Sequence, residues 1–213
     1  MNIIKPQKLL LDKLVKVENL LEEIKYTDVL ENRIVENINC ENIELYDIKF
    51  ENVIFNNVNI ISSKLEKNTF INVRFVNCNF SNTSFDSSCF IRCEFYNCKV
   101  TGCSFIEARL YNVTFENSNA NYINLAMASM ENILFSNTIL RNSCFQENKL
   151  KNIYFEKADL TQAQFFKTSL KNIDLSDSII EGIAISLEDI KGATINQFQA
   201  TDLLYLIGVK IKY

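Results

Sequence analysis

The stretch FVNCNFSNTSFDSSCF, residues 75–90, places a phenylalanine at every fifth position, at 75, 80, 85 and 90. An α-helix repeats its apolar face about every 3.6 residues and a β-strand about every two, so neither element explains this spacing. A backbone that returns to the same orientation every five residues must turn after each short segment. The stretch therefore indicates a repeat architecture, which has to be identified before any other feature of the chain.

The five-residue register extends far beyond this stretch. Counted by fives from Cys40 to Ile195, every position is apolar, and no insertion or deletion interrupts the count. A second series, two residues before each centre, is small or β-branched, as at Val73 and Cys78. A third series, two residues after each centre, is dominated by asparagine: Asn52, Asn57, Asn72, Asn77, Asn82, Asn97, Asn112, Asn117, Asn132, Asn137, Asn142, Asn152 and Asn172.

Asparagine tolerates a left-handed backbone and hydrogen-bonds to its own neighbours, so the third series predicts corners. A corner every five residues closes a square after four sides, which gives a coil of about 20 residues with one large and one small side chain pointing inward from each side. Residues 20 apart then stack. About eight coils at ~4.8 Å each would form a rod on the order of 38 Å long. One predicted stack is the aromatic column Phe55, Phe75, Phe95, Phe115, Phe135 and Phe155.

Composition restricts the function as well as the fold. With 213 residues and 47% hydrophobic content, the chain is long enough for one buried core, and no apolar run approaches the ~18 residues of a membrane span. Charges interrupt the N-terminal residues 1–16 too often for a signal peptide, so we expect a cytoplasmic protein that does not associate with a membrane. The formal charge of −4 argues against direct binding of nucleic acid.

The residues that usually carry catalysis are missing. There is no histidine, the commonest general base and metal ligand, and only four glycines and one proline are available for phosphate-binding loops. We therefore expect no enzyme activity, no catalytic residue, no cofactor and no metal site.

Seven cysteines invite a metal or redox interpretation, but their spacing favours packing. Cys93, Cys98 and Cys103 recur every five residues rather than as CxxC pairs, and each occupies the small inward position. Cys89 and Cys144 immediately precede central residues, so we expect them to point outward. No histidine is present to activate them.

Both ends of a solenoid need caps, because an open end exposes strand edges and core. Apolar residues from Leu10 to Ile24 recur at spacings of four and three, which predicts a capping helix over 7–25. At the other end, Asn196 and Gln199 predict a reciprocal helix cap, and Gly208 fits the position after the helix. The predicted regions are an N-terminal helix and cap over 1–37, the solenoid over 38–195, and a C-terminal helix and tail over 196–213.

The register resembles that of the pentapeptide-repeat family, and KADLTQAQF at 157–165 is close to its consensus. The resemblance covers about 38–195 and implies an all-β solenoid, a right-handed quadrilateral β-helix. The C-terminal segment, with Asp189 and Gly192 ahead of its Phe198-Gln199-Ala200 and Leu203-Leu204 pairs, resembles that of Qnr-type and MfpA-like quinolone-resistance proteins. The register has no interruption for the two loops that many Qnr proteins carry, so MfpA-like or loopless behaviour fits better.

This second resemblance implies a homodimer formed through the C-terminal helix; the alternative is a helix that only caps a monomer. The implied interface residues are Phe198, Leu203, Leu204, Leu206, Ile207, Val209 and Ile211. It also implies a rod that mimics DNA and binds a type II topoisomerase, DNA gyrase or topoisomerase IV, to modulate it or protect it from fluoroquinolones. The candidate acidic surface comprises Asp86, Glu94, Glu116, Glu131, Glu156 and Asp159. Lysines and arginines interleave with these acids, so a protein-interaction scaffold with an unrelated bacterial partner is the alternative.

Overall fold

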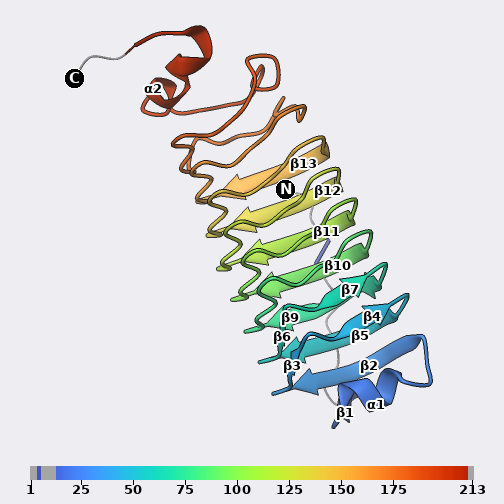
Figure 1. Cartoon of the computed structure of the whole chain (residues 1–213). Helices are drawn as coiled ribbons and strands as arrows, with labels where there is room; N and C mark the ends of the chain where they lie inside the picture. The colour runs from blue at the N-terminus through green and yellow to red at the C-terminus, as the bar shows by residue number, and fades with distance from the viewer. Residues whose placement is uncertain (1–3, 6–12, 211–213) are drawn as a thin grey trace.

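The chain winds into a parallel β-solenoid whose coils stack from the N-terminal to the C-terminal end of a rod (Figure 1). The computed structural model describes residues 4–5 and 13–210. From β2 (Val29–Glu36) onward, paired strands are parallel and join each residue to the one four repeats later, as in Phe95 with Phe115. One coil therefore takes four five-residue repeats, and the predicted quadrilateral β-helix is confirmed.

The strands are either eight or three residues long, and the eight-residue strands cover two sides of a coil. The long strands are β2, β5 (Lys49–Asn56), β10 (Cys89–Tyr96), β11 (Arg109–Glu116), β12 (Ser129–Ser136) and β13 (Lys149–Glu156). The short strands are β1 (Val15–Val17), β3 (Asn39–Glu41), β4 (Glu44–Tyr46), β6 (Asn59–Ile61), β7 (Lys64–Glu66), β8 (Thr69–Ile71) and β9 (Arg74–Val76). The helices are α1 (Leu20–Ile24), α2 (Ala200–Leu203) and the 3₁₀ turn η2 (Leu204–Ile207).

The corners of the coils are made by residues in the left-handed region, where φ is near +55°. The series begins at Asn32 (φ 54°) and recurs every five residues as far as Asn172 (φ 64°), and all the predicted corner asparagines belong to it. Asparagine side chains also bond between coils, as when Asn72 Nδ2 donates to Asn52 Oδ1 at 3.1 Å. At Gly102 a Cβ would lie 2.5 Å from Asn82 Oδ1, so a larger residue at this corner would displace the Asn82 side chain.

The four sides of the coil, here called A to D, are defined by their central residues. Side A is centred on Phe50, Phe70, Phe90, Leu110, Met130 and Leu150, and side B on Phe55, Phe75, Phe95, Phe115, Phe135 and Phe155. Side C is centred on Ile60, Phe80, Val100, Ala120, Leu140 and Leu160, and side D on Leu65, Phe85, Phe105, Leu125, Phe145 and Phe165. All these central residues are buried except Leu150, which is half-buried.

Aromatic rings fill the lumen in two geometries. Rings on the same side of successive coils stack, with centroids 4.6 Å apart and planes 5° apart for Phe95 and Phe115. Rings on adjacent sides meet edge to face, at 5.4 Å and 89° for Phe75 and Phe80. Each such pair adds about 0.5–1.5 kcal/mol beyond the burial of its area. The predicted aromatic column of side B is continuous from Phe55 to Phe155.

The small inward position carries a second set of bonds between coils. Ser88 Oγ donates to the Leu65 carbonyl at 3.0 Å and accepts from the Asn68 N–H at 3.1 Å. Cysteine can replace the hydroxyl as donor: Cys103 Sγ donates to the Phe80 carbonyl at 2.8 Å. The inward cysteines are free and buried, so the predicted packing role of Cys93, Cys98 and Cys103 is confirmed.

The N-terminal prediction needs a correction. Residues 15–24 do not form one helix: Val15–Val17 is strand β1, which pairs with β2, and α1 covers only Leu20–Ile24. The β-branched Val15 and Val17 suit a strand, and the side chain of Asn19 caps α1 by accepting from the Leu21 and Glu22 N–H groups. Residues 7–12 of the predicted helix lie outside the described residues.

The C-terminal cap follows its prediction more closely. Asn196 Oδ1 accepts from the Gln199 N–H at 3.0 Å, and Gln199 Oε1 accepts from the Asn196 N–H at 2.8 Å, which is the reciprocal cap. Gly208 ends η2 with φ 73°. Gln199 Nε2 also donates to the Leu175 carbonyl at 2.8 Å, so the cap is joined to the core of the last coils.

We expect Phe95→Ala to destabilise the fold by about 3–5 kcal/mol, because it removes a fully buried ring between two stacked partners. The control is Tyr96→Ala at the next residue, which points outward and is 41% exposed; we expect a loss below ~1 kcal/mol. The measurement is the urea midpoint followed by circular dichroism. Equal losses for the two variants would contradict the proposed inward and outward alternation.

We also expect alkaline pH to destabilise the protein through its buried thiols. Burial raises the pKa of Cys93 and of Cys103 to about 12, whereas a thiol in the unfolded chain ionises near pH ~8.5. Below pH ~8.5 the thiols are protonated in both states and the full stability is present. Between there and pH 12 only the unfolded chain releases these protons, so the free energy of unfolding falls as the pH rises.

Each buried thiol should lower the free energy of unfolding by about 1.4 kcal/mol per pH unit within this window. The double variant Cys93→Val, Cys103→Thr copies the residues one coil earlier, Val73 and Thr83, and should show a shallower decline. Urea denaturation at a series of pH values from ~8.5 to ~10 measures both slopes. Identical slopes would show that these thiols do not control the alkaline stability.

Candidate protein-binding surface

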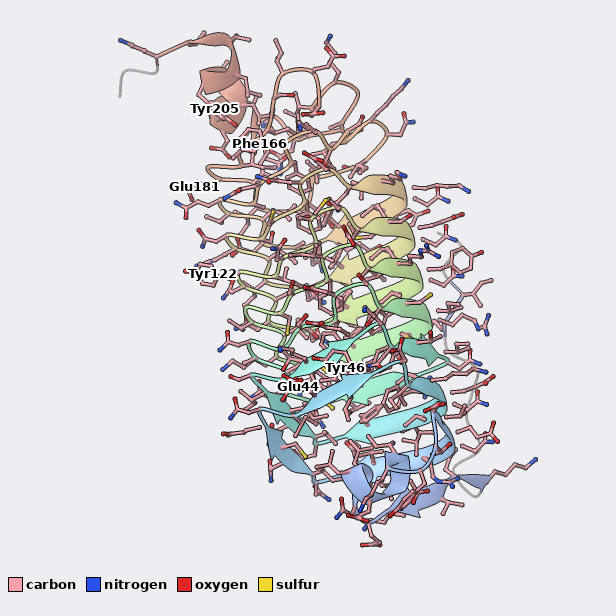
Figure 2. The ribbon with its side chains drawn as sticks, turned by 45° about the vertical axis from the view of Figure 1, so that its right-hand side comes forward. Glu44, Tyr46, Tyr122, Phe166, Glu181 and Tyr205 are labelled. Atoms are coloured by element: carbon pink, nitrogen blue, oxygen red, sulfur yellow. The ribbon has the colours of Figure 1, made fainter. Side chains whose placement is uncertain are left out.

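The outer surface of the rod is organised in columns, because equivalent residues of successive coils lie one above the other. On each side, the residue before the centre and the two residues after it point outward, while the centre and the small residue point inward. Figure 2 shows side chains such as Tyr122 and Glu181 projecting away from the rod. Any partner therefore meets rows of side chains at intervals of about 4.8 Å.

Opposite charges pair between neighbouring coils over much of this surface. Lys64 bonds to Glu44 at 2.9 Å, Lys151 to Glu131 at 2.7 Å and Lys167 to Glu147 at 2.7 Å. In each pair the lysine lies one coil after its glutamate, in the same column. The hydrogen bond with Glu44 raises the pKa of Lys64, and the bond with Lys64 lowers the pKa of Glu44. Exposed pairs of this kind contribute little stability, but they neutralise charge locally.

The six acidic residues expected to face a topoisomerase are distributed over all four sides. Asp86 lies on side D, Glu131 on side A and Asp159 on side C, whereas Glu94, Glu116 and Glu156 lie on side B. The structure therefore brings three of the six together. The sequence written in rows of 20 residues would already have separated the side B acids from the other three, because the position of a residue within the coil determines its side.

Several of these carboxylates have local partners. Asp86 Oδ1 accepts from Ser104 Oγ and from the Ile106 N–H, the latter at 2.9 Å. Asp159 pairs with Arg141 at 2.6 Å. Partial burial opposes ionisation of Asp159, but its hydrogen bonds with Thr161 and Arg141 outweigh that effect and lower its pKa. Such partners hold a carboxylate in place and reduce the charge that it presents to another protein.

Side B carries a row of carboxylates that runs towards the C-terminal end. Glu94 pairs with Arg74 at 3.3 Å and with Lys5 at 3.9 Å. Glu116 and Glu156 share one column, separated by Ser136. Asp174 and Asp177 continue the same side on the next coil, and hydrogen bonds with Ser176 lower the pKa of Asp174.

A second surface, which sequence reasoning missed, is uncharged. We call it the neutral strip; it consists of the outward residues of side D that immediately precede and follow each centre from 104 to 186. Its members are Ser104, Ile106, Asn124, Ala126, Cys144, Gln146, Gln164, Phe166, Ala184 and Ser186. Phe166 is 44% exposed, and Tyr122, at the neighbouring corner, is 62% exposed (Figure 2). Reading the sequence in columns, one coil below another, would have revealed the strip.

The predicted dimer residues divide into two groups at the C-terminal cap. Leu203 and Leu206 are partly buried and pack against the core, and Leu204 is also partly buried. Phe198 and Ile207 are exposed by 78% and 61%, and Val209 is exposed as well. Ile211 lies outside the described residues. The cap therefore seals the last coil with one face and leaves an apolar patch on the other.

The described residues contain no obvious site for a metal. Within 4–5 and 13–210, no group of three or more His, Cys, Asp or Glu side chains could hold an ion. Cys89 and Cys144 are half-buried and free, and burial raises the pKa of the Cys89 thiol. In the same part of the chain, no helix has the length and apolar character needed to cross a membrane.

Comparison with known proteins identifies the repeat. A model described as "Pentapeptide repeat region" matches residues 88–165, and one described as "Pentapeptide repeats (8 copies)" matches 69–105 and 149–182. Together the matches extend over more than half of the chain. No curated protein matches it.

Solved structures with similar folds have low sequence identity. They include a trypsin-treated variant of QnrB1, a plasmid-mediated fluoroquinolone resistance protein, at 17% identity and a TM-score of 0.43, covering 93% of this chain and 96% of that one. HetL, from the cyanobacterium Nostoc sp. strain PCC 7120, has 12% identity, a TM-score of 0.40 and coverages of 84% and 94%. Rfr23, from the cyanobacterium Cyanothece 51142, has 12% identity, a TM-score of 0.30 and coverages of 83% and 97%. The function has to be argued from this chain's own residues.

Proposed function

Because this chain belongs to the pentapeptide-repeat family, we propose that it is a non-enzymatic rod that binds other proteins through its outer surface. The observation that carries the proposal is the filled lumen: the large central side chains of the coils point inward and are buried. The side chains left for recognition stand in columns on a scaffold held by main-chain bonds from coil to coil. Such a surface is rigid before it meets a partner, so little conformational entropy is lost on binding.

For the partner, we propose a type II topoisomerase, DNA gyrase or topoisomerase IV, bound at its DNA-binding surface. The carboxylates of side B support this choice, since negative charge spaced along one side of a rod resembles the phosphates of a DNA strand. The resemblance of the C-terminal segment to Qnr-type and MfpA-like proteins supports the same choice. In this interaction, the charges of side B would speed the encounter and orient the rod, while its shape would provide specificity.

The ion pairs elsewhere on the rod favour side B as the binding side. On sides A, C and D, acids such as Glu131, Asp159 and Glu44 are paired with bases. On side B only Glu94 has such a pair in the described part of the chain, where Glu116, Glu156 and Asp174 take part in none. The proposed contact therefore extends along side B, beyond Glu94, rather than around the rod.

We further propose that two copies form a homodimer through the C-terminal cap. Three large apolar side chains of the cap, Phe198, Ile207 and Val209, are exposed, and exposed apolar surface of this kind favours a contact with another protein. A two-fold contact through the same patch on both copies would cover it and place the rods end to end. The dimer would then present a longer acidic row than one rod alone.

The neutral strip favours a second candidate function, a scaffold for an unrelated partner. Exposed Phe166 and Tyr122, among uncharged neighbours, resemble the aromatic anchors of protein interfaces more than the phosphates of DNA. This candidate predicts that binding depends on side D rather than on side B. The two candidates can therefore be separated with variants on different sides.

The purified protein should change the supercoiling activity of gyrase or topoisomerase IV, or its inhibition by a fluoroquinolone, at micromolar concentration. The double variant Glu116→Lys, Glu156→Lys should weaken this effect by about tenfold or more, because charges at a rim contact set the rate of encounter. Glu181→Lys, an exposed reversal on side C, is the matched control and should behave as the parent does.

A parent protein that leaves both topoisomerases unaffected would overturn the proposed partner. If the parent is active and the double variant on side B is as active as the Glu181→Lys control, side B is not the contact. Recovery of another bacterial protein whose binding is lost in Phe166→Ala, with no topoisomerase subunit, would favour the scaffold.

The dimer is tested separately by sedimentation velocity. We expect Phe198→Asp and Ile207→Asp each to halve the observed mass, because a charge in a buried apolar contact is left without a partner. Tyr26→Asp, at the opposite end and 83% exposed, is the control and should leave the mass unchanged. A monomeric parent, or variants that remain dimers, would overturn the proposed interface.

A further inference from the structure

Within residues 13–210 the solenoid is open between β13 and the coil that follows it. A cleft of about 600 Å³ lies there, lined by residues 150–156 on one flank and by residues from Ser169 to Asp177 on the other. Figure 1 shows β13 as the last strand arrow before the C-terminal end. The uninterrupted register predicted from sequence gave no sign of this cleft.

The cleft marks an interruption in the main-chain pairing of sides A and B. In other coils the N–H of a central residue donates to a carbonyl of the next coil, as Phe80 does to Lys99 at 2.8 Å. By that pattern Leu150 and Asn152 would donate to Ser169 and Lys171, but no main-chain bond joins 149–156 to 169–177, both within the described part of the chain. The next coil is paired again, since Leu175 donates to Thr194 at 2.8 Å.

The opening is confined to two sides of the coil. On side C the bridge series continues through Asp159 and Ile179, and on side D through Gln164 and Ala184. The two coils are therefore held together on one half of the square and parted on the other. Leu150 shows the effect: it is only half-buried, whereas Met130, one coil earlier on the same side, is 1% exposed.

The two ends of the cleft carry opposite charge. At the side A end, Lys171 lies one coil after Lys151 in the same column. In the ion pairs between coils elsewhere on the rod, such as Glu131 with Lys151, a lysine instead lies one coil after a glutamate. At the side B end the lining carries three carboxylates, Glu156, Asp174 and Asp177, and Ser176 takes the position opposite Glu156. The cleft thus has a cationic end on side A and an anionic end on side B.

Both flanks offer what an extended peptide needs. Main-chain donors and acceptors of each flank lack a partner on the other, and unpaired edges of this kind accept an added strand. Inward from them lie the buried side chains of Ile153, Phe155, Ile173 and Leu175. A strand inserted between two edges gains hydrogen bonds on both of its sides, whereas a strand added to a sheet edge gains them on one.

We propose that this cleft binds an extended segment of a partner protein as an additional strand, parallel to the coils on either side. The segment carries acidic side chains over Lys151 and Lys171 and basic side chains over Glu156, Asp174 and Asp177. Its apolar residues follow the five-residue register of the flanks, with an asparagine at the corner between Asn152 and Asn172, and point towards Phe155 and Leu175. Charge complementarity at the two ends fixes the direction of the segment, acidic first and basic second. The proposal does not require a topoisomerase contact, but the two would compete, because Glu156 and Asp174 belong both to the cleft and to the acidic row of side B.

The probe is a synthetic eight-residue peptide, blocked at both ends, that copies the register of residues 149–156: valine at positions 2, 5 and 7, glutamate at 1 and 3, asparagine at the corner position 4, and lysine at 6 and 8. Fluorescence anisotropy should show saturable binding, and hydrogen exchange should show new protection of amides in 150–155 and 169–174. Three control peptides are compared: one with lysine first and glutamate second, one with alternate amides N-methylated, and one with proline in place of valine. Each should bind at least about tenfold more weakly, because the charge match or the main-chain bonds are lost.

The matched protein variant is Lys171→Glu, which places a carboxylate opposite Lys151 and should favour closure of the cleft. We expect it to bind the probe about tenfold or more weakly and to protect the amides of Leu150 and Asn152 without peptide. Lys99→Glu, a reversal on side C, should behave as the parent does. Failure of the parent to bind the probe, equal binding of the N-methylated or lysine-first peptide, or protection of these amides in the free parent would each overturn the proposal.

Discussion

The left-handed corner, repeated every five residues, is the constraint on which the rest of this structure depends. A residue with φ near +55° recurs every five positions from Asn32 to Asn172, and each one turns the chain from one side of the square coil to the next. Because the interval never changes, each residue lies beside its equivalent in the next coil, and one set of parallel main-chain bonds can extend along the rod. A single insertion would shift every later side chain away from its column, which accounts for a register without interruptions.

The closely spaced corners make the lumen narrow, and the narrow lumen explains why large and small inward residues alternate. Only one large side chain per side fits, and rings such as Phe95 and Phe115 stack because the coil spacing brings their centroids to 4.6 Å, within the range that offset-stacked aromatic pairs prefer. The remaining inward position must be small. Where it is Ser88 or Cys103, it also donates to a carbonyl of the preceding coil, so a polar atom is buried without losing its hydrogen bond.

With the inside fully occupied by packing, function must reside on the outside or in a defect. The outside supplies three distinct surfaces in columns: the acidic row of side B, the neutral strip of side D and the apolar patch at the C-terminal cap. Among the described residues, the defect is the parted pair of coils after β13, where the sequence retains its register and Lys171 follows Lys151. Register therefore specifies the path of the chain but does not by itself ensure that neighbouring coils pair.

The sequence by itself determined the period, the corners and the inward residues, because each depends on contacts that repeat identically from coil to coil. It also determined the reciprocal cap of Asn196 and Gln199, which is a local interaction. It did not determine the extent of the N-terminal helix, where pairing of Val15–Val17 with β2 overrode a helical spacing. Only the tertiary structure decided which acids share a side, which are paired with bases, and where two coils part, because these depend on outward side chains that meet across coils and differ at each one.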